Sequence, residues 1–199
     1  MLTPSHFNHI QESEAAKLPA EAYTDFTDQQ RNAIGKINGT IEETFRPLMQ
    51  YAYQHYMTCG QWSNHELLTW ILAQTGPADV NIGVWSISEA GARKLVDLLD
   101  SGCIFALNAV LDYRSQNRHP EAHQLAKHAF SNVVTFPMHA KITTIKNDSW
   151  SVCLCTSANY TNNPRPEAGC IITVPNVVDF YNSILLNILD HGNPFEWPT

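Results

Sequence analysis

The feature that most constrains the fold is an alternation between two hydrophobic patterns in the middle of the chain. DVNIGVWSI (79–87) is rich in residues that favour strands, and SEAGARKLVDLLDSG (88–102) has apolar residues at helical spacing. CIFALNAVLDY (103–113) predicts a second buried strand, and HPEAHQLAKHAF (119–130) a second amphipathic helix. An order of strand, helix, strand and helix is typical of parallel strands whose sheet is covered by helices.

Further elements are predicted on both sides of this alternation. Asn64 is expected to be the N-cap of a helix that ends at Gly76, while the aromatic stretch 49–62 is compatible with a strand or a short helix. More strands are expected at 132–138, 141–146, 150–157 and 171–174, and a closing helix at 177–191. The sequence therefore predicts an α/β fold with a mixed β-sheet sandwiched between helices.

The first 48 residues differ in character from the rest of the chain. They are polar and contain short helical patterns, such as those at 14–23 and 28–37. We expect residues 1–48 to be an N-terminal accessory segment and residues 49–199 to be the domain that carries the function.

Composition indicates the cellular setting and the class of partner. No apolar run approaches the roughly 20 residues that span a bilayer, so no membrane insertion is expected. The five cysteines are an odd number without a CxxC pair, which favours reduced thiols in the cytoplasm. The net charge is −7, yet residues 114–165 contain six basic side chains against two acidic ones. Such an asymmetry is typical of a surface that meets an anionic substrate.

Three common kinds of catalytic site are disfavoured. The histidines at 119, 123 and 128 lack the His-Glu-x-x-His order of a zinc protease, because Pro120 follows the first of them. No glycine-rich phosphate loop ends in Lys-Ser/Thr, and no serine lies in a G-x-S-x-G elbow. No metal site is predicted.

One stretch, residues 137–169, concentrates residue types suited to handling a phosphate. In order, they are His139, Lys141, Ser157, Asn159 and Glu167. This order resembles the signature of the phospholipase D superfamily, in which an H-x-K motif on a strand is followed by a hairpin, a Ser-x-Asn turn and a glutamate. The order of strands and helices over residues 64–191 is also similar to one half of that fold. The chain resembles most the small, single-copy members associated with phages and plasmids, which include endonucleases.

The resemblance implies a two-step phosphoryl transfer that needs no metal or other cofactor. His139 is then the nucleophile, because a neutral imidazole attacks phosphorus and is well populated near neutral pH. Lys141 is expected on the same face of the strand, where its ammonium neutralises phosphate oxygens. Asn159 is expected to donate to the phosphate, and Glu167 to orient the imidazole.

Further residues are expected to contact the substrate. The Ser157 hydroxyl is expected to donate to phosphate oxygens, and Lys146 and Arg165 are expected to bind the substrate as part of the basic region. The family pattern has an aspartate five residues after its lysine. Here that position is Lys146, and the nearest acid is Asp148. Thr156 also stands where a glycine is common.

Two functions from different classes are compatible with these residues. The first is a metal-independent phosphodiesterase that acts through a phosphohistidine, with nucleic acid as its expected substrate. The second is a catalytically silent binding or structural protein of a mobile element that keeps the fold and its phosphate pocket. A phospholipase is a weaker third reading, since no amphipathic helix with a basic face offers membrane docking.

The count of H-x-K motifs adds an expectation about assembly. The phosphohistidine route uses two histidines on opposite sides of the phosphorus, and this chain contains a single H-x-K. The resemblance therefore implies a homodimer in which His139 of each subunit contributes to one shared active site.

Overall fold

The computed structural model describes residues 31–34, 40–162 and 164–191 of the 199-residue chain. Within these ranges the strands form one eight-stranded sheet. They are β1 (Arg31–Ile34), β2 (Ala52–Thr58), β3 (Ala78–Val84), β4 (Ile104–Asp112), β5 (Asn132–Phe136), β6 (Ile142–Lys146), β7 (Ser151–Thr156) and β8 (Glu167–Ile172). The helices are α2 (Ile41–Thr44), α3 (Asn64–Thr75), α4 (Glu89–Asp100), α5 (Ser115–Arg118), α6 (Pro120–Ala129) and α7 (Pro175–His191).

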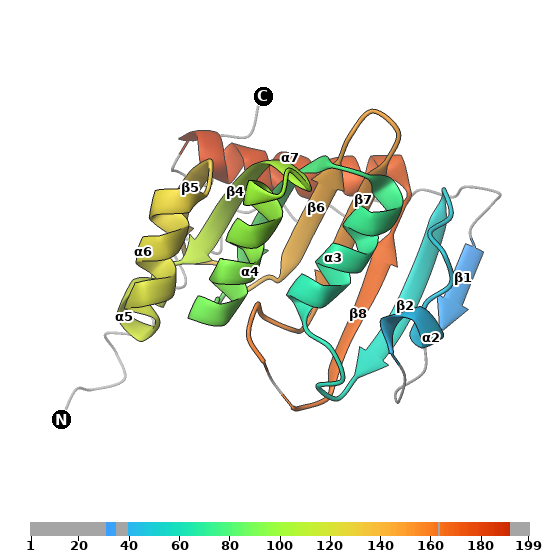
Figure 1. Ribbon diagram of the computed structural model, residues 1–199. Helices are drawn as coiled ribbons and strands as arrows, with labels where there is room; N and C mark the ends of the chain where they lie inside the picture. The colour runs from blue at the N-terminus through green and yellow to red at the C-terminus, as the bar shows by residue number, and fades with distance from the viewer. Residues whose placement is uncertain (1–30, 35–39, 163, 192–199) are drawn as a thin grey trace, which may run out of the picture.

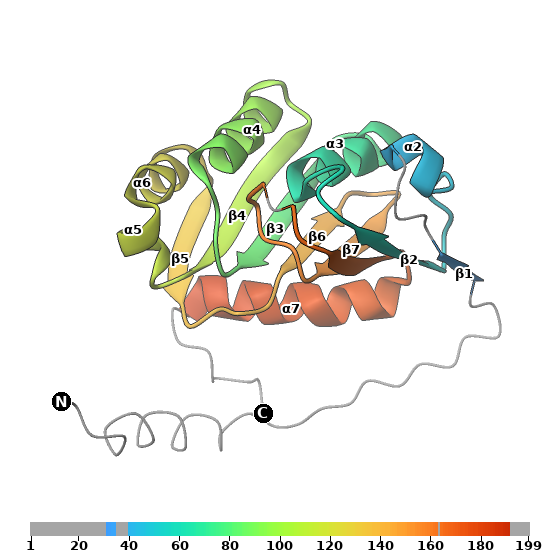
Figure 2. The same cartoon turned by 90° about the horizontal axis from the view of Figure 1, so that it is seen from below.

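The sheet is mixed, and helices cover both of its faces. Its strand order is β1-β2-β8-β7-β6-β3-β4-β5. The β3–β4 and β4–β5 pairs are parallel, whereas the pairs from β3 through β6, β7 and β8 to β2 are antiparallel. Helices α3, α4 and α6 lie on one face, and α7 runs beneath the other (Figures 1 and 2). The predicted α/β fold is confirmed.

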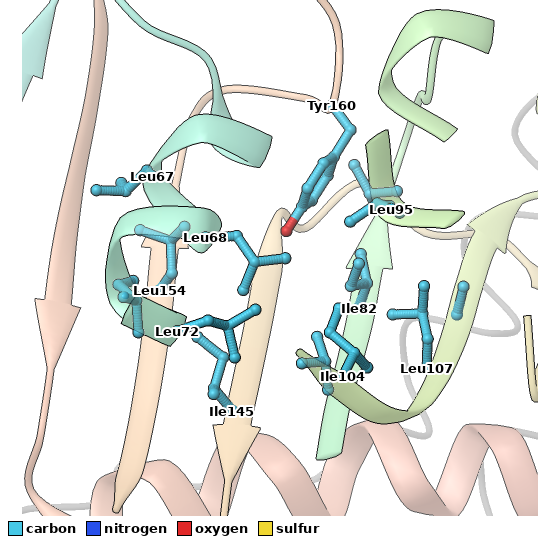
Figure 3. Packing of buried hydrophobic residues seen from close by; sticks show 14 of the residues in the cluster. Leu67, Leu68, Leu72, Ile82, Leu95, Ile104, Leu107, Ile145, Leu154 and Tyr160 are labelled. Carbon is cyan, nitrogen blue, oxygen red and sulfur yellow. The ribbon is translucent and has the colours of Figure 1, made fainter. Parts of the chain in front are cut away.

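The main hydrophobic core lies between the sheet and helices α3, α4 and α6. Leu67 and Leu68 of α3 and Leu95 of α4 are fully buried against Ile82 and Leu154 of the sheet (Figure 3). Leu185, Ile188 and Leu189 of α7 form a second cluster on the opposite face. Burial on both faces explains why the central strands appear in the sequence as nearly continuous apolar runs.

Most predicted elements between residues 64 and 191 are confirmed, with small differences at their ends. Helix α3 begins after Ser63, not after Asn64, because Ser63 and Glu66 form a capping box: the Ser63 N–H donates to Glu66 Oε2 at 2.7 Å. Gly76 ends α3 with a φ of 77°, and Gly102 follows α4 with a φ of 72°. The last strand, β8, is longer than predicted and begins at Glu167.

The N-terminal side gives one correction and settles one open choice. Residues 31–34, part of a predicted helical pattern, form strand β1, because they pair in parallel with β2 and such pairing overrides weak local propensity. The stretch 49–62 contains strand β2. Ile41 and Phe45 are buried in the main core, whereas the predicted helical pattern at 14–23 lies outside the described residues.

Two further observations concern the chain as a whole. No helix in the described part is long and apolar enough to cross a membrane. The cysteines, which all lie in described positions, are unpaired thiols.

Candidate active site at one edge of the sheet

The strand directions bring the ends of several strands to one edge of the sheet. β6 runs antiparallel to β3 and β4, and β7 and β8 continue this alternation. The carboxyl ends of β3, β4 and β7 therefore share an edge, here called the site edge, with the amino ends of β6 and β8. The polar, charged and aromatic residues at or beside these ends are Trp85, Ser86, Asp112, Arg114, His139, Lys141, Ser157, Asn159 and Glu167.

His139 and Lys141 lie side by side just before β6. Lys141 Nζ donates to the backbone carbonyl oxygen of His139 at 2.7 Å, and the His139 ring centroid lies 6.0 Å from that of Trp85. His139 is exposed, and Lys141 is partly buried. Burial lowers the pKa of Lys141, while the carboxylates of Glu167 and Asp112 act in the opposite direction. An accessible imidazole thus lies beside an ammonium group that two carboxylates favour in its charged form.

The prediction that this motif lies on a strand is wrong. Pairing between β6 and β3 begins at Ile142, so both motif residues precede the strand. The carbonyl of Lys141 still accepts a hydrogen bond from the Thr156 N–H at 3.1 Å. Met138, by contrast, is buried in the cluster that contains Leu185 of α7. This burial explains why the chain leaves the plane of the sheet before the motif.

Hydrogen bonds of Ser157 join the end of β7 to the start of β8, where Glu167 lies. The Ser157 hydroxyl makes a short hydrogen bond to Glu167 Oε2 and accepts one from the Ala168 N–H at 3.0 Å. The Ser157 N–H donates to the Ala168 carbonyl at 2.8 Å. Here the Ser157 hydroxyl therefore supports Glu167. Its phosphate contact and the orientation of His139 by Glu167 stay predictions.

Asn159 is held by the segment that follows β3. Its Oδ1 accepts a hydrogen bond from the Ser86 N–H at 3.1 Å, which leaves the amide NH2 as the group that can donate to a ligand. The Tyr160 N–H donates to the Ser86 carbonyl at 3.3 Å, and the Ser88 N–H to the Tyr160 carbonyl at 3.0 Å. The ring of Tyr160 is fully buried, with its hydroxyl 2.8 Å from Thr143 Oγ1 (Figure 3). Core packing of Tyr160 thereby fixes the position of the neighbouring Asn159.

Three positively charged side chains of the site edge lie close to the ring of Trp85. The guanidinium carbon of Arg118 lies 4.6 Å from the ring centroid, and that of Arg114 lies at 5.8 Å. Lys141 Nζ also lies at 5.8 Å. We call this group, Trp85 with Arg114, Arg118 and Lys141, the Trp85 platform. Cation–π attraction between each cation and the face of the indole favours these positions.

Asp112 holds one of the three cations. Its side chain is completely buried at the end of β4, and its two carboxylate oxygens accept from Arg114 Nε at 2.7 Å and from Arg114 Nη2 at 3.1 Å. The Arg114 backbone N–H also donates to Asp112 Oδ1 at 3.1 Å. This bidentate pair raises the pKa of Arg114 above its usual value. Arg114 is therefore fixed in place, and its charge is balanced by Asp112.

A polar pocket of about 330 Å³ opens beside Glu167. Its walls come from the loop after β2, the first turn of α3 and the loop between β7 and β8, and they include Trp62, Asn64 and Ala158. Asn64 Nδ2 donates to the Ala158 carbonyl at 2.7 Å, which fixes the wall next to Asn159. The site edge thus continues into a concave region large enough for part of a ligand.

One predicted substrate contact is separated from the site. Lys146 is the last residue of β6, at the end opposite the motif, and its Nζ lies 2.5 Å from Asp179 Oδ1 of α7. Asp148 follows it in the turn between β6 and β7. Lys146 therefore lies apart from His139 and Lys141, because β6 separates them, and its contact with the substrate stays a prediction. Arg165 lies exposed in the loop that borders the pocket, on the side of the site edge.

The structure gives separate surroundings to the three histidines of the disfavoured metal site, His119, His123 and His128. His123 is buried, and its Nδ1 lies 3.2 Å from the Ser115 hydroxyl of α5. His119 precedes α6, and His128 lies exposed in its last turn. Among the residues that the structure describes, no group of three or more His, Cys, Asp or Glu side chains suits a metal ion.

Sequence reasoning missed Trp85 and Asp112 as members of the site, and it placed Arg114 and Arg118 only within the basic region. A signal was present, because Trp85 and Asp112 lie at the carboxyl ends of two adjacent predicted parallel strands. Ligands of open α/β sheets bind at that end of the strands. The convergence of three cations on one ring had no signal in the sequence, since it depends on packing.

Comparison with known proteins bears on the fold. No protein-family model matches the sequence, and no curated protein matches it. Among solved structures, the chain is similar to Nuc from Salmonella typhimurium, a phospholipase D family member, with a TM-score of 0.50 and 14% identity over 68% of this chain and 91% of that one. It also matches polyphosphate kinase from Porphyromonas gingivalis, with a TM-score of 0.46 and 11% identity over 66% of this chain and 22% of that one. At such identities the likeness to Nuc concerns the architecture, and the chain therefore has a phospholipase D-like α/β fold.

Proposed function

We propose that the protein hydrolyses phosphodiester bonds of nucleic acid without a metal ion, with His139 as nucleophile. The observation that carries the proposal is the meeting of His139, Lys141, Asn159 and Glu167 at one edge of a phospholipase D-like sheet. These residues are separated by up to 28 positions in the sequence, from 139 to 167. The fold brings them to one location, although the stability of the fold does not require them to meet there.

The first step is attack of a neutral His139 ring nitrogen on phosphorus. The new P–N bond forms as the bond from phosphorus to the leaving oxygen breaks, and that oxygen takes up a proton from a general acid. Lys141 and the NH2 group of Asn159 stabilise the charge on the non-bridging oxygens. To do so, Lys141 exchanges its present hydrogen bond to the His139 carbonyl for one to the phosphate.

The second step returns the enzyme to its starting state. A water molecule attacks phosphorus, loses its proton to the group that acted as the acid, and displaces His139 as the P–N bond breaks. Glu167 accepts a hydrogen bond from the protonated or neutral imidazole and so keeps its orientation. In the proposal this contact forms when the substrate binds, with Ser157 holding Glu167 in place beforehand.

The general acid is proposed to be His139 of a second copy of the chain. None of the other eight histidines lies in an H-x-K sequence followed by Ser-x-Asn. The exposure of His139 supports the proposal, because an exposed imidazole can reach a second subunit across a twofold axis. The active assembly is thus a homodimer with one shared site.

A second candidate is a catalytically silent protein that binds phosphate-containing ligands. The absence of an aspartate at the family position favours this candidate, since Lys146 occupies it and pairs with Asp179. That position lies at the opposite end of β6 from His139, however. The missing aspartate therefore affects the attachment of β6 to α7 more than it affects the chemistry of the site edge.

The test is hydrolysis in the presence of EDTA. Wild-type protein and His139→Ala are assayed on single-stranded DNA, double-stranded DNA, RNA and bis(p-nitrophenyl) phosphate, with Arg46→Ala, which removes an exposed arginine next to α2, as control. We expect hydrolysis by wild type and by the control, and none by His139→Ala. Loss of wild-type activity on adding EDTA would contradict the metal-free route. Inactivity on every substrate would favour the silent protein.

A further inference from the structure

The Trp85 platform has more positive charge than a single phosphodiester needs. Lys141 belongs to the site of hydrolysis, and Arg114 is balanced by the buried carboxylate of Asp112. In the described part of the chain, no carboxylate lies within ion-pair distance of Arg118. Its guanidinium is therefore an uncompensated cation held against an aromatic ring.

The surroundings of Trp85 indicate that the face of its ring, and not its N–H group, has the functional role. The indole N–H is buried, and none of the described residues accepts a hydrogen bond from it. A buried donor left without an acceptor destabilises the folded state. A phenylalanine or leucine would avoid this cost but would give a weaker surface, or no aromatic surface, for the cations. The ring is thus best explained as a support for Arg114 and Arg118.

The geometry points to a second phosphate-binding subsite, and we infer that Arg118, positioned by Trp85 and accompanied by Arg114, binds the neighbouring phosphate of a nucleic-acid strand. The inference rests on the proposed function and specifies its substrate. A guanidinium presents two parallel N–H groups that match two oxygens of a phosphate. Holding it on an aromatic ring lowers the entropy that is lost when a phosphate binds.

The distances around Trp85 set an upper limit on the separation of the two subsites. The His139 ring lies 6.0 Å from the Trp85 ring, and the Arg118 guanidinium lies 4.6 Å from it. Both distances start at the same ring, so their sum is an upper limit for the separation. That limit corresponds to a few nucleotides at about 3.4 Å of rise per nucleotide. One phosphate can therefore reach His139 while a near neighbour lies at Arg118.

This arrangement discriminates between classes of diester. A phospholipid head group presents one phosphodiester, frequently next to a cationic group that Arg118 would repel. An isolated small diester fills the His139 site and leaves Arg118 without an anion. A polynucleotide occupies both subsites at once, so it is the substrate class that the platform favours.

Binding tests the subsite without relying on turnover. In a His139→Ala background, the affinity for a short labelled oligodeoxythymidine is measured by fluorescence anisotropy over a range of salt concentrations. Removing one phosphate contact from a single strand should reduce the slope of log K against log salt by about 0.7. We expect this change on adding Arg118→Ala. Arg118→Lys should keep the slope but weaken binding, because the paired N–H groups are lost. Arg46→Ala, which removes an exposed arginine beside α2, is the matched control and should have no effect.

Turnover and competition complete the experiment. For Arg118→Ala, kcat/KM on the oligonucleotide should fall about tenfold more than on bis(p-nitrophenyl) phosphate, as the loss of a hydrogen bond between charged groups implies. Equal falls on both substrates, or an unchanged salt slope, would overturn the subsite. Tighter binding of inorganic polyphosphate than of the oligonucleotide would overturn the assignment to nucleic acid. A changed slope in a protein that hydrolyses nothing would support the subsite while contradicting the proposed hydrolysis.

Discussion

The side-chain oxygen of Asn159 accepts a hydrogen bond from the backbone N–H of Ser86 at 3.1 Å, which joins the turn after β7 to the segment after β3. This contact determines which side of the amide meets a ligand. The oxygen is occupied by the backbone, so the NH2 group is the part available to a phosphate. Without the contact, the amide could rotate and present either group.

Asn159→Asp tests this orientation with almost no change in shape. The carboxylate can still accept from the Ser86 N–H, so we expect the thermal midpoint to change little. The donor to the phosphate is replaced by a negative charge, and hydrolysis should fall by about 100-fold or more, as when an oxyanion donor is removed. The measurements are kcat/KM on bis(p-nitrophenyl) phosphate and a melting curve. Full activity in Asn159→Asp would contradict the proposed role of the NH2 group.

Gly91→Ala tests the close approach between α4 and the Asn159 turn. A Cβ at position 91 would overlap the backbone carbonyl oxygen of Tyr160, which cannot move aside as a flexible side chain could. We expect a loss of about 1–3 kcal/mol in the free energy of unfolding, larger than the gain in helix propensity. Denaturant titration measures it, and Ala90→Gly at the exposed neighbouring position shows the effect of propensity alone. A more stable Gly91→Ala protein would show that the carbonyl can shift without cost.

The lowered pKa of Lys141 predicts an alkaline limit on activity. In the proposed mechanism the ammonium form stabilises the phosphate, and this form is lost as the pH rises through the pKa of Lys141. Because burial lowers that pKa, hydrolysis should decline at a pH below the ordinary lysine value of about 10.4. Lys141→Arg keeps its charge over this range, so the decline should be absent from the residual activity and from oligonucleotide binding. A decline at the same pH in both proteins would assign it to another group.

His123 predicts a stability change on the acidic side of neutrality. Its burial, and to a lesser degree the positive charge of Lys127, lowers its pKa. Between this lowered value and about 6.5 in the unfolded chain, the unfolded state binds more protons, so stability rises with pH. We therefore expect the melting temperature of wild type to fall below about pH 6.5. In His123→Gln the dependence on pH should be smaller. An equal dependence would assign the effect to another group, such as His65, whose pKa is also lowered by burial.

The proposed shared site predicts that inactive subunits suppress active ones. Wild-type protein is mixed with an excess of His139→Ala under conditions that allow subunits to exchange. If each site needs His139 from both subunits, activity per wild-type subunit should fall toward zero, because mixed dimers lack one imidazole. The same excess of bovine albumin serves as a control for dilution. Unchanged activity, or a monomer in light scattering at the assay concentration, would contradict the shared site.

The sequence by itself determined the layer architecture. The alternation of β-rich and amphipathic segments from 79 to 130 is a local property, and it predicted strands and helices that the structure contains. The residues from His139 to Glu167 were also identifiable, because their types and order are visible along the chain. Capping was less accurate: Ser63 took the role expected of Asn64, since the reciprocal bond to Glu66 decides between two suitable neighbours.

The tertiary structure decided which of these residues meet. Strand direction brings Trp85, at the end of β3, next to His139, before β6, and the same rule sends Lys146 to the opposite end of β6. The position of Trp85 does not follow from spacing, because it depends on how distant strands pair, whereas the strand itself carries Lys146 away from Lys141 by about 3.3 Å per residue. The attachment of Asn159 to Ser86 and of Arg118 to Trp85 depends likewise on contacts between distant segments. Such contacts form only when packing in the core fixes the elements that hold them, as burial of Tyr160 does for Asn159.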